Sequence, residues 1–231
     1  MKLKNAVVLI TGANRGLGRA FAEAALAAGA AKVYAAARTP AAIDLPGVVP
    51  VALDVTDPAQ VAAAAARCAD VTLLINNAGI SRQGRLLAAD GMAAARAELE
   101  TNFFGPWAVA RAFAPVLQAN GGGAVLNVLS VLSWLTLPGV ATYSASKAAA
   151  WSLSNGLRNE LKAQGTQVTS LHVGFMDTDM TRGLEAPKAA PTDVARFALE
   201  GIEAGAFEVL ADDLSRQVKH SLSSPTPAYA G

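Results

Sequence analysis

Short runs of apolar residues alternate with longer alanine-rich stretches along the chain. The apolar runs are rich in Val, Leu and Ile and are nearly continuous, which is typical of parallel strands that helices cover on both faces. They predict strands at residues 6–11, 32–36, 48–53, 71–76, 124–130 and 167–173, and a weaker strand at 207–210.

The stretches between these strands predict helices at residues 16–28, 58–68, 88–119 (with a break), 141–163 and 192–204. Gly29, Gly121–Gly123 and Gly165 stand where helices should end, since glycine adopts positive φ easily. This alternation predicts an α/β fold of the Rossmann type: a single domain, residues 1–231, with a doubly wound parallel sheet of about seven strands and helices on both faces. Residues 224–231 are predicted to form a flexible tail.

Composition limits the classes of partner. A formal net charge of +1 and a charged fraction of 16% give no basic field for nucleic acid or an acidic membrane, so a small molecule is expected. Only six apolar or small residues precede Gly12 after the first few residues, too few for a signal peptide or a membrane span, so a cytoplasmic location is expected. Cys68 is the only cysteine, which excludes an intramolecular disulfide and a thiol-based metal cluster. No metal site is expected.

The first predicted strand runs directly into a glycine-rich turn, Thr11–Gly18 (TGANRGLG), and a predicted helix follows. A glycine turn between strand and helix is typical of a dinucleotide site, because N–H groups at the helix start bind the pyrophosphate. Gly12 permits the tight turn, and Gly16 and Gly18 let the pyrophosphate approach the backbone. The spacing differs from the more familiar Gly-x-Gly-x2-Gly, so a purely structural turn stays the alternative.

The end of the second predicted strand indicates which dinucleotide binds. A site for NAD usually has a carboxylate there that holds the ribose 2′-hydroxyl. Here Ala36 and Ala37 are followed by Arg38, whose guanidinium can pair with a 2′-phosphate. Arg15, in the glycine turn, can reach the same phosphate. The two arginines together favour NADP(H), although either alone is commonly a solvated surface residue.

Tyr143 and Lys147 are four residues apart in a predicted helix and therefore share a face. An ammonium group near a phenol favours the phenolate, so Lys147 is expected to lower a tyrosine pKa that is about 10 in water. At ~4 Å and an effective dielectric of ~20, one charge contributes up to ~4 kcal/mol, enough to make tyrosine a general acid/base near neutral pH. A Tyr-x3-Lys pair alone is common on protein surfaces, so it indicates function only together with other motifs.

Five motifs follow one another along the chain. Thr11–Gly18 contains Thr-Gly-x3-Gly-x-Gly, Asn76–Gly79 reads Asn-Asn-Ala-Gly, and Asn102 lies in the long predicted helix. Ser130 ends the fifth predicted strand, ahead of the Tyr-x3-Lys pair. From residue 5 to about residue 180 the chain thus resembles the short-chain dehydrogenase/reductase (SDR) family, in the branch with TGxxxGxG and YxxxK motifs.

The resemblance implies an oxidoreductase that transfers a hydride between the nicotinamide of NADP(H) and a carbonyl or alcohol substrate. It implies that Tyr143 protonates the carbonyl oxygen, that Ser130 holds this oxygen by a hydrogen bond, and that Lys147 binds the nicotinamide ribose. Asn102 would help to hold a chain of water that returns the proton. The cofactor-binding residues that it implies are Gly12, Asn14, Arg15, Gly16, Leu17, Gly18, Arg38, Asp54, Val55, Asn77, Ala78, Gly79, Tyr143, Lys147, Gly174, Met176 and Thr178.

Three polar residues of this region have simpler alternatives. Asp54 can cap a helix, because aspartate is favoured just before one. Ser133 and Ser144 are interpreted as a turn residue and a helix-start residue rather than as catalytic groups.

The chain departs from the family pattern at three places. Val173–Gly174 replaces the usual Pro-Gly, and Leu129 stands where a second serine is common. The C-terminus lacks the usual Asp-Gly-Gly finish. The family's tetramer uses that region, so a homo-oligomer is expected without a choice between dimer and tetramer.

Apolar residues in the loops after the fifth and sixth strands indicate the class of substrate. Open parallel sheets bind ligands at this edge, so an apolar ketone or aldehyde is expected, with ordinary core packing as the alternative for each residue. The residues concerned are Trp134, Leu135, Leu137, Val140, Phe175, Met180 and Leu184.

Two other functions share this scaffold: a non-catalytic NADP-binding regulator, and a lyase of the dehalogenase kind. Such regulators typically lose the Tyr-Lys pair, and such lyases lose the glycine turn. This chain retains both, which favours the oxidoreductase.

Overall fold

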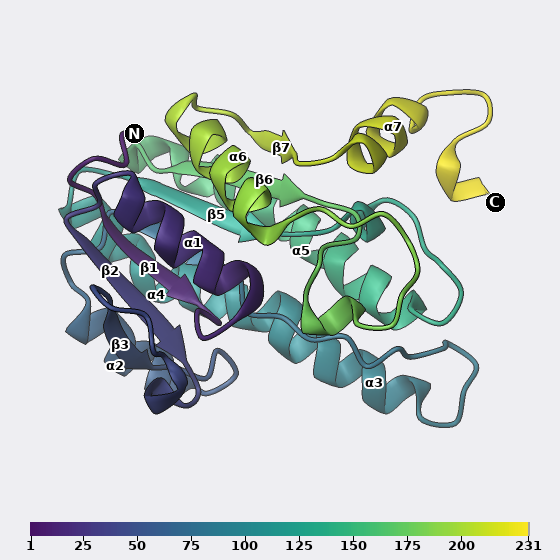
Figure 1. The fold of residues 1–231 in the computed structure, drawn as a ribbon, viewed down its shortest axis with the longest axis horizontal. Helices are drawn as coiled ribbons and strands as arrows, with labels where there is room; N and C mark the ends of the chain where they lie inside the picture. Colours follow the sequence, from purple (N-terminus) through teal and green to yellow (C-terminus); the bar gives the residue numbers. More distant parts are fainter. Residues whose placement is uncertain (231) are drawn as a thin grey trace.

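The computed structural model describes residues 1–230, and its centre is a parallel sheet with the strand order β3-β2-β1-β4-β5-β6-β7 (Figure 1). The ends of the predicted strands differ from those observed by no more than two residues. The strands are β1 (Val7–Thr11), β2 (Lys32–Ala37), β3 (Val49–Ala52), β4 (Leu73–Asn76), β5 (Ala124–Val128), β6 (Gln167–His172) and β7 (Glu208–Leu210). The predicted seven-stranded, doubly wound α/β fold is confirmed.

Helices cover both faces of the sheet, with α1 and α6 on one face and α2, α4 and α5 on the other (Figure 1). The predicted break in the long helix is a π-helical segment, Glu100–Phe104, between α3 and α4. The helices are α1 (Gly16–Ala27), α2 (Pro58–Arg67), α3 (Gly91–Leu99), α4 (Gly105–Ala119), α5 (Ala141–Glu160), α6 (Pro191–Glu203) and α7 (Asp213–Ser221). Helix α7 was not predicted, because its sequence is polar and only Ser215 and Val218 of it are buried.

The alternation of side chains along the strands divides the core into two layers. Val8 and Ile10 of β1 pack on the side of α1 and α6. Leu9, between them, packs with residues of α2 and α4. All three are fully buried, and each such side chain stabilises the fold by ~1.5–3 kcal/mol relative to an exposed one.

The strand order places a crevice at the carboxyl end of the sheet. The chain runs outward from β1 through β2 to β3, and then returns to the other side of β1 to continue with β4. At such a reversal the loops after β1 and β4 diverge, and ligands of open α/β sheets bind in the gap.

Two peripheral features complete the fold. The chain leaves α7 and forms one 3₁₀ turn at Ala228–Ala230; Gly231, the last residue of the predicted tail, lies outside the described residues, so the tail's flexibility stays a prediction. Within residues 1–230, no helix has the length and apolar character needed to cross a bilayer.

Candidate active site

The glycine turn after β1 is locked to the loop after β4. The Thr11 hydroxyl oxygen accepts hydrogen bonds from the N–H groups of Asn77 and Ala78, both at 3.0 Å. The Asn77 amide donates to the carbonyl oxygens of Thr11 at 2.9 Å and Gly12 at 3.2 Å. A Cβ atom on Gly18 would lie 2.1 Å from the Gly12 carbonyl oxygen, so glycine is required there. The Thr-Gly and Asn-Asn-Ala-Gly motifs therefore form one rigid unit.

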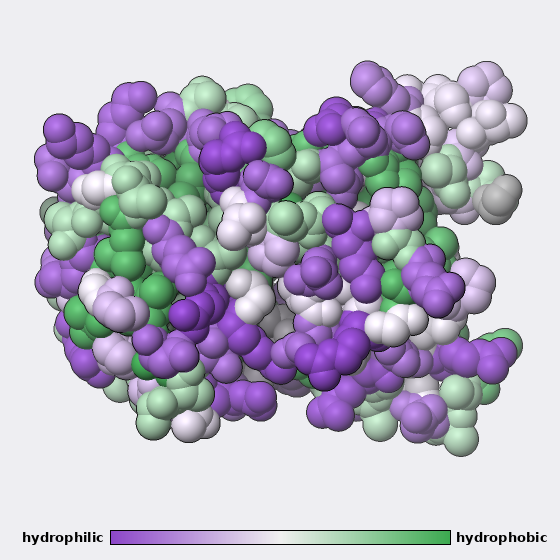
Figure 2. All heavy atoms as spheres, viewed as in Figure 1, coloured by the Kyte–Doolittle hydropathy of each residue, from purple (hydrophilic) through white to green (hydrophobic). Residues whose placement is uncertain are grey.

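The start of α1 lies beside an open cavity of about 410 Å³, and Figure 2 shows the surface hollowed near this place. No acidic residue occurs in the first turn of α1, so its positive end suits an anion. Gly16 has a φ of 53°, which favours glycine, and the Thr178 side chain lies close to it, 3.5 Å from where a Cβ atom would stand. These features fit the pyrophosphate of a dinucleotide. The cavity is lined by Gly16, Asp177, Thr178, Asp179, Arg182, Gly183 and Lys188.

The two arginines predicted to bind a 2′-phosphate differ in their contacts. Arg38 is exposed and directly follows the buried Ala37 at the end of β2. Arg15 forms an ion pair with Asp179 at 2.8 Å, and Asp179 also pairs with Arg182. Arg15 must therefore exchange a carboxylate partner for a phosphate if it is to bind the cofactor.

Four other predicted cofactor residues are engaged within the protein. The Asp54 carboxylate accepts from the Thr56 N–H at 3.0 Å, whereas the cap of α2 is Asp57, so Asp54 is not the helix cap. Val55 is 7% exposed and belongs to the core. The Gly174 N–H donates to the carboxylate of Asp212, the residue that caps α7. Met176 packs against the apolar core. Of the predicted cofactor residues not yet placed, Gly12 and Asn14 lie in the loop after β1, Leu17 lies in the first turn of α1, and the others lie in the loop after β4 or at the start of α5.

Asn102 connects three elements of the site. Its amide oxygen accepts from the Ile80 N–H, and its amide nitrogen donates to the Ile80 carbonyl and to the Ser146 hydroxyl, each at 2.9 Å. It thereby ties the loop after β4 to α5 from within the π-helical segment. Such segments are rare and are often found at functional sites.

Ser130 lies at the carboxyl end of β5 and is 6% exposed. Its hydroxyl accepts from the Leu132 N–H at 3.1 Å and donates to the Val173 carbonyl at 3.5 Å. Ser133 is also buried, and its hydroxyl has no hydrogen-bond partner within residues 1–230. The Ser144 hydroxyl donates to the Val140 carbonyl at 3.1 Å, as expected for a helix-start residue.

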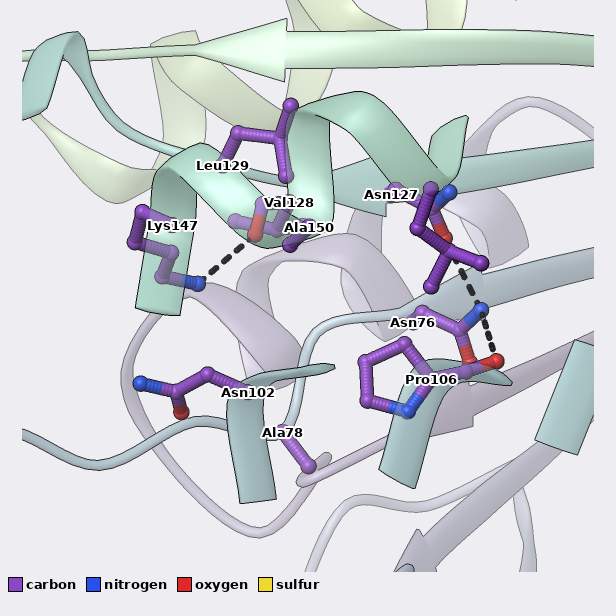
Figure 3. A pocket seen from close by; sticks show the side chains of 10 residues that line it. Asn76, Ala78, Asn102, Pro106, Asn127, Val128, Leu129, Lys147 and Ala150 are labelled. Atoms are coloured by element: carbon purple, nitrogen blue, oxygen red, sulfur yellow. Dashed lines mark hydrogen bonds between the residues drawn. The ribbon is translucent and has the colours of Figure 1, made fainter. Parts of the chain in front are cut away.

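Lys147 and Tyr143 lie on the same face of α5. The Lys147 ammonium nitrogen donates to the Val128 carbonyl at 2.9 Å (Figure 3) and is 5.7 Å from the centroid of the Tyr143 ring. A Cβ atom on Gly79 would lie 3.7 Å from this nitrogen, so the loop after β4 closely approaches the lysine. The Tyr-Lys pair therefore stands beside the unit formed by the two glycine-containing motifs.

Burial dominates the titration of this pair. It lowers the pKa of Lys147 to about 8. Burial, and then the nearby Glu98 carboxylate, raise the pKa of Tyr143 above its usual range. The sequence predicted that Lys147 would lower this pKa, but the effects that act on the phenol in the structure are burial and the Glu98 carboxylate, and both raise it.

A cavity of about 10 Å³, the size of one water molecule, lies between Asn102 and Lys147 (Figure 3). Beside it the Asn76 amide donates to Asn127 at 2.9 Å, and the Asn127 amide donates to the Ser154 hydroxyl at 2.9 Å. The second asparagine is thus a buried polar residue that sequence reasoning missed; its signal was an amide in an otherwise apolar strand.

Sequence reasoning also missed two buried ionisable residues. Glu98 is fully buried; one oxygen accepts from the Arg82 N–H at 2.6 Å, and the other has no partner within the described part of the chain. His172 is fully buried beneath Ser130. The available signal was a single ionisable residue at a buried position of an element: Glu98 in α3 and His172 in β6.

The fold, the glycine turn and the Tyr-Lys pair together define a dinucleotide-binding protein of the doubly wound class. The family model for short chain dehydrogenases matches residues 6–189. The chain belongs to the short-chain dehydrogenase/reductase family, whose members are oxidoreductases.

Two curated relatives illustrate the range of the family. The chain is 30% identical over 206 residues to 3-oxoacyl-(acyl-carrier-protein) reductase of Salmonella typhimurium, covering 82% of this chain and 81% of the relative. It is 34% identical over 197 residues to dehydrogenase/reductase SDR family member 7B of Bos taurus, covering 78% of this chain. The matched region spans only 60% of the bovine protein.

Two solved structures bind different dinucleotides. A short chain dehydrogenase from Burkholderia cenocepacia in complex with NADP is 43% identical, with a TM-score of 0.93, covering 97% of this chain and 95% of that one. A short chain dehydrogenase/reductase from Burkholderia phymatum in complex with NAD is 26% identical, with a TM-score of 0.82 and 98% of each chain covered.

Proposed function

We propose that this protein is an NADP(H)-dependent carbonyl reductase, which passes a hydride between the nicotinamide and a carbonyl or alcohol substrate. One observation carries the proposal: the buried Lys147 and the neighbouring Tyr143 stand against the loop after β4, and that loop is hydrogen-bonded to the glycine turn. A proton donor is thereby placed beside a dinucleotide site, which is the arrangement that hydride transfer to a carbonyl requires.

The cofactor, when bound, supplies or accepts the hydride. Tyr143 donates the proton to the carbonyl oxygen, and its raised pKa keeps it protonated for this step. Ser130 turns its hydroxyl from the Val173 carbonyl, a weak partner at 3.5 Å, toward the same oxygen. The Lys147 ammonium stabilises the phenolate that remains. Asn102 fixes the loop and helix that hold these groups.

The preference for NADP(H) rests on charge. Arg38 follows β2 directly, and the residue before it, where a carboxylate would bind a 2′-hydroxyl, is Ala37. The Burkholderia cenocepacia relative, which is 43% identical, was solved with NADP, and this supports the same choice here.

The substrate class rests on the exposed apolar residues at the mouth of the site. Leu137, Met180 and Leu184 are 39%, 48% and 41% exposed in the loops that follow β5 and β6. They favour an apolar ketone or aldehyde. Trp134, in contrast, is buried and packs against His172, so it belongs to the core. The cytoplasmic location and homo-oligomeric state expected from the sequence stay predictions.

The test is reduced-nicotinamide absorbance with a panel of apolar ketones, aldehydes, sugars and charged carbonyl compounds. Tyr143→Phe should bind NADPH as the parent does and lower turnover by ~10²- to 10⁴-fold, the usual contribution of general acid/base catalysis. Tyr229→Phe, an exposed tyrosine in the C-terminal segment, is the matched control and should leave turnover unchanged. Full turnover by Tyr143→Phe would contradict the mechanism. Turnover of sugars or charged compounds alone would contradict the substrate class.

A further inference from the structure

Directly behind Ser130 lies a buried histidine that the proposed mechanism does not use. His172 ends β6 and is fully buried, and its Nδ1 atom is 3.2 Å from the Ser130 carbonyl oxygen. A carbonyl oxygen only accepts hydrogen bonds, so Nδ1 carries the proton and donates. The Ser133 N–H donates to the same oxygen at 3.0 Å. The imidazole therefore holds the backbone of the residue whose hydroxyl meets the substrate.

The imidazole is itself fixed by two indole rings. It stacks on Trp134 with ring centroids 3.9 Å apart and an interplanar angle of 17°. Trp151 of α5 presents its edge at 6.5 Å and 79°. Trp134 belongs to the turn that begins at Ser130, so the histidine contacts this turn both through the Ser130 carbonyl and through the stacked indole.

The C-terminal strand and helix close this cluster from the outside. Lys219 of α7 places its ammonium nitrogen 4.8 Å from the Trp134 centroid and 5.4 Å from the Trp151 centroid. Glu208 of β7 accepts from the Trp151 indole N–H at 3.0 Å and pairs with Lys219 at 2.6 Å. Val218 packs with Trp134 in the same cluster. The β7–α7 segment is thereby connected to the turn that carries Ser130.

Burial decides the charge state of the imidazole. Burial lowers the pKa of His172 to about 4, against the opposing effects of the hydrogen bond to Ser130 and of the Glu208 carboxylate; Lys219 and Lys147 are the cations that face the ring. The ring is therefore neutral at neutral pH, with the proton on Nδ1 and a bare Nε2 that lies 3.7 Å from the Glu208 carboxylate. Of the two neutral tautomers, only this one donates the hydrogen bond to the Ser130 carbonyl.

We propose that His172 is a positioning residue for Ser130, and that through it the β7–α7 segment sets the orientation of the hydroxyl that binds the substrate oxygen. The inference rests on the proposed function, because His172 acts only through Ser130. Removal of the Nδ1–H donor lets the Ser130 turn shift, and a shift of this kind affects kcat rather than cofactor binding.

The test compares His172→Phe with His172→Asn. Phenylalanine keeps an aromatic ring on Trp134 but removes the donor, and should lower kcat by ~10- to 100-fold, the cost of a small misplacement of a reacting group. The KM for NADPH should stay unchanged. Asparagine returns an N–H near the position of Nδ1 and should restore most of the lost kcat. His220→Phe, on the exposed face of α7, is the matched control.

A double-mutant cycle separates positioning from a general structural effect. In a Ser130→Ala background, His172→Phe should lower kcat no further, because the group that it positions is absent. A further loss of the same size, or a failure of His172→Asn to restore kcat, would overturn the proposal. A normal kcat in the Ser130→Ala variant would contradict the proposed mechanism. A lowered kcat in Ser130→Ala together with a normal kcat in His172→Phe would overturn only the inference about His172.

Lys219→Met provides a second approach if His172→Phe does not fold. It removes the cation above the two indoles and the partner of Glu208 but leaves the imidazole bond in place. The proposal is supported if Lys219→Met lowers kcat in the parent but has no effect on kcat in the Ser130→Ala background. It is overturned if Lys219→Met leaves kcat of the parent unchanged.

Discussion

On the proposed function, two exposed arginines set the preference for NADPH over NADH, and their contacts in the structure differ. The Arg38 side chain has no ion-pair partner within residues 1–230, whereas Arg15 is paired with Asp179 at 2.8 Å. A 2′-phosphate must therefore compete with Asp179 for Arg15 but not for Arg38. Arg38→Ala should reduce the preference for NADPH more than Arg15→Ala does.

The size of the preference follows from exposure. The Arg15 and Asp179 side chains are 71% and 46% exposed, and exposed ion pairs contribute ~0–1 kcal/mol each. Two arginines then favour NADPH by up to ~2 kcal/mol, a factor of about 30 in affinity. Because screening acts on exposed charges, the preference should shrink as salt rises.

Two substitutions should move the preference in opposite directions. Ala37→Asp supplies a carboxylate for the 2′-hydroxyl and repels the 2′-phosphate, so it should favour NADH. Asp179→Asn releases Arg15 and should raise the NADPH preference by up to ~5-fold, the upper limit for an exposed pair. Asp193→Asn removes a comparable carboxylate that pairs with Arg196 on α6 and should change nothing.

The assay is the ratio of kcat/KM for NADPH to that for NADH, measured for each variant at low and high salt. The ratio cancels effects common to both cofactors, such as a change in the field at the pyrophosphate. A parent that favours NADH, or a ratio unaffected by Ala37→Asp and Arg38→Ala together, would refute the reasoning and leave both arginines as solvated surface charges.

Three further predictions concern the catalytic residues and the glycine turn. Glu98→Gln preserves the acceptor for the Arg82 N–H but removes the charge that raises the pKa of Tyr143, so the alkaline limb of the reduction pH profile should move to lower pH; an unmoved limb would show that the carboxylate does not act on the phenol. Lys147→Met should lower kcat, measured by steady-state kinetics, and weaken NADPH binding, measured by titration. An unchanged affinity for NADPH would rule out its role in binding the ribose, and an unchanged kcat would rule out its role in stabilising the phenolate. Gly18→Ala should lower the free energy of unfolding in urea by ~1–3 kcal/mol, as overpacking does, because its Cβ atom would meet the Gly12 carbonyl oxygen at 2.1 Å; unchanged stability would mean that the turn adapts freely.

The elements with strong periodicity were predictable and those with polar sequences were not. The apolar runs of β1, β4 and β5 located the sheet, and the family motifs located the residues at its carboxyl edge. Helix α7 was missed because it buries little apolar surface and is held by contacts far away in sequence, such as the bond from the Gly174 N–H to Asp212. Local patterns carry no information about such contacts.

The same limit applies to the charges in the site. The sequence placed Lys147 one helical turn from Tyr143 and so predicted a lowered tyrosine pKa. It gave no sign that Glu98 would lie near the phenol or that the lysine would donate to the Val128 carbonyl. Both contacts come from packing between α3, β5 and α5, which only the folded chain defines.

On the proposed mechanism, the protonation state of Tyr143 sets how the two directions of the reaction depend on pH. A phenol with a raised pKa is an acid at rest, so it is ready to protonate a carbonyl oxygen, whereas alcohol oxidation first requires its deprotonation. Each pKa unit above neutral costs about 1.4 kcal/mol for that step at pH 7. Lys147, with a pKa of about 8, is still largely protonated at pH 7 and stabilises the phenolate only after the proton has left. On the proposed mechanism, the rate of oxidation is therefore expected to rise as the pH rises toward the pKa of Tyr143, whereas reduction, which uses the protonated phenol, should not become faster over the same range; an oxidation rate that does not change with pH would contradict this assignment.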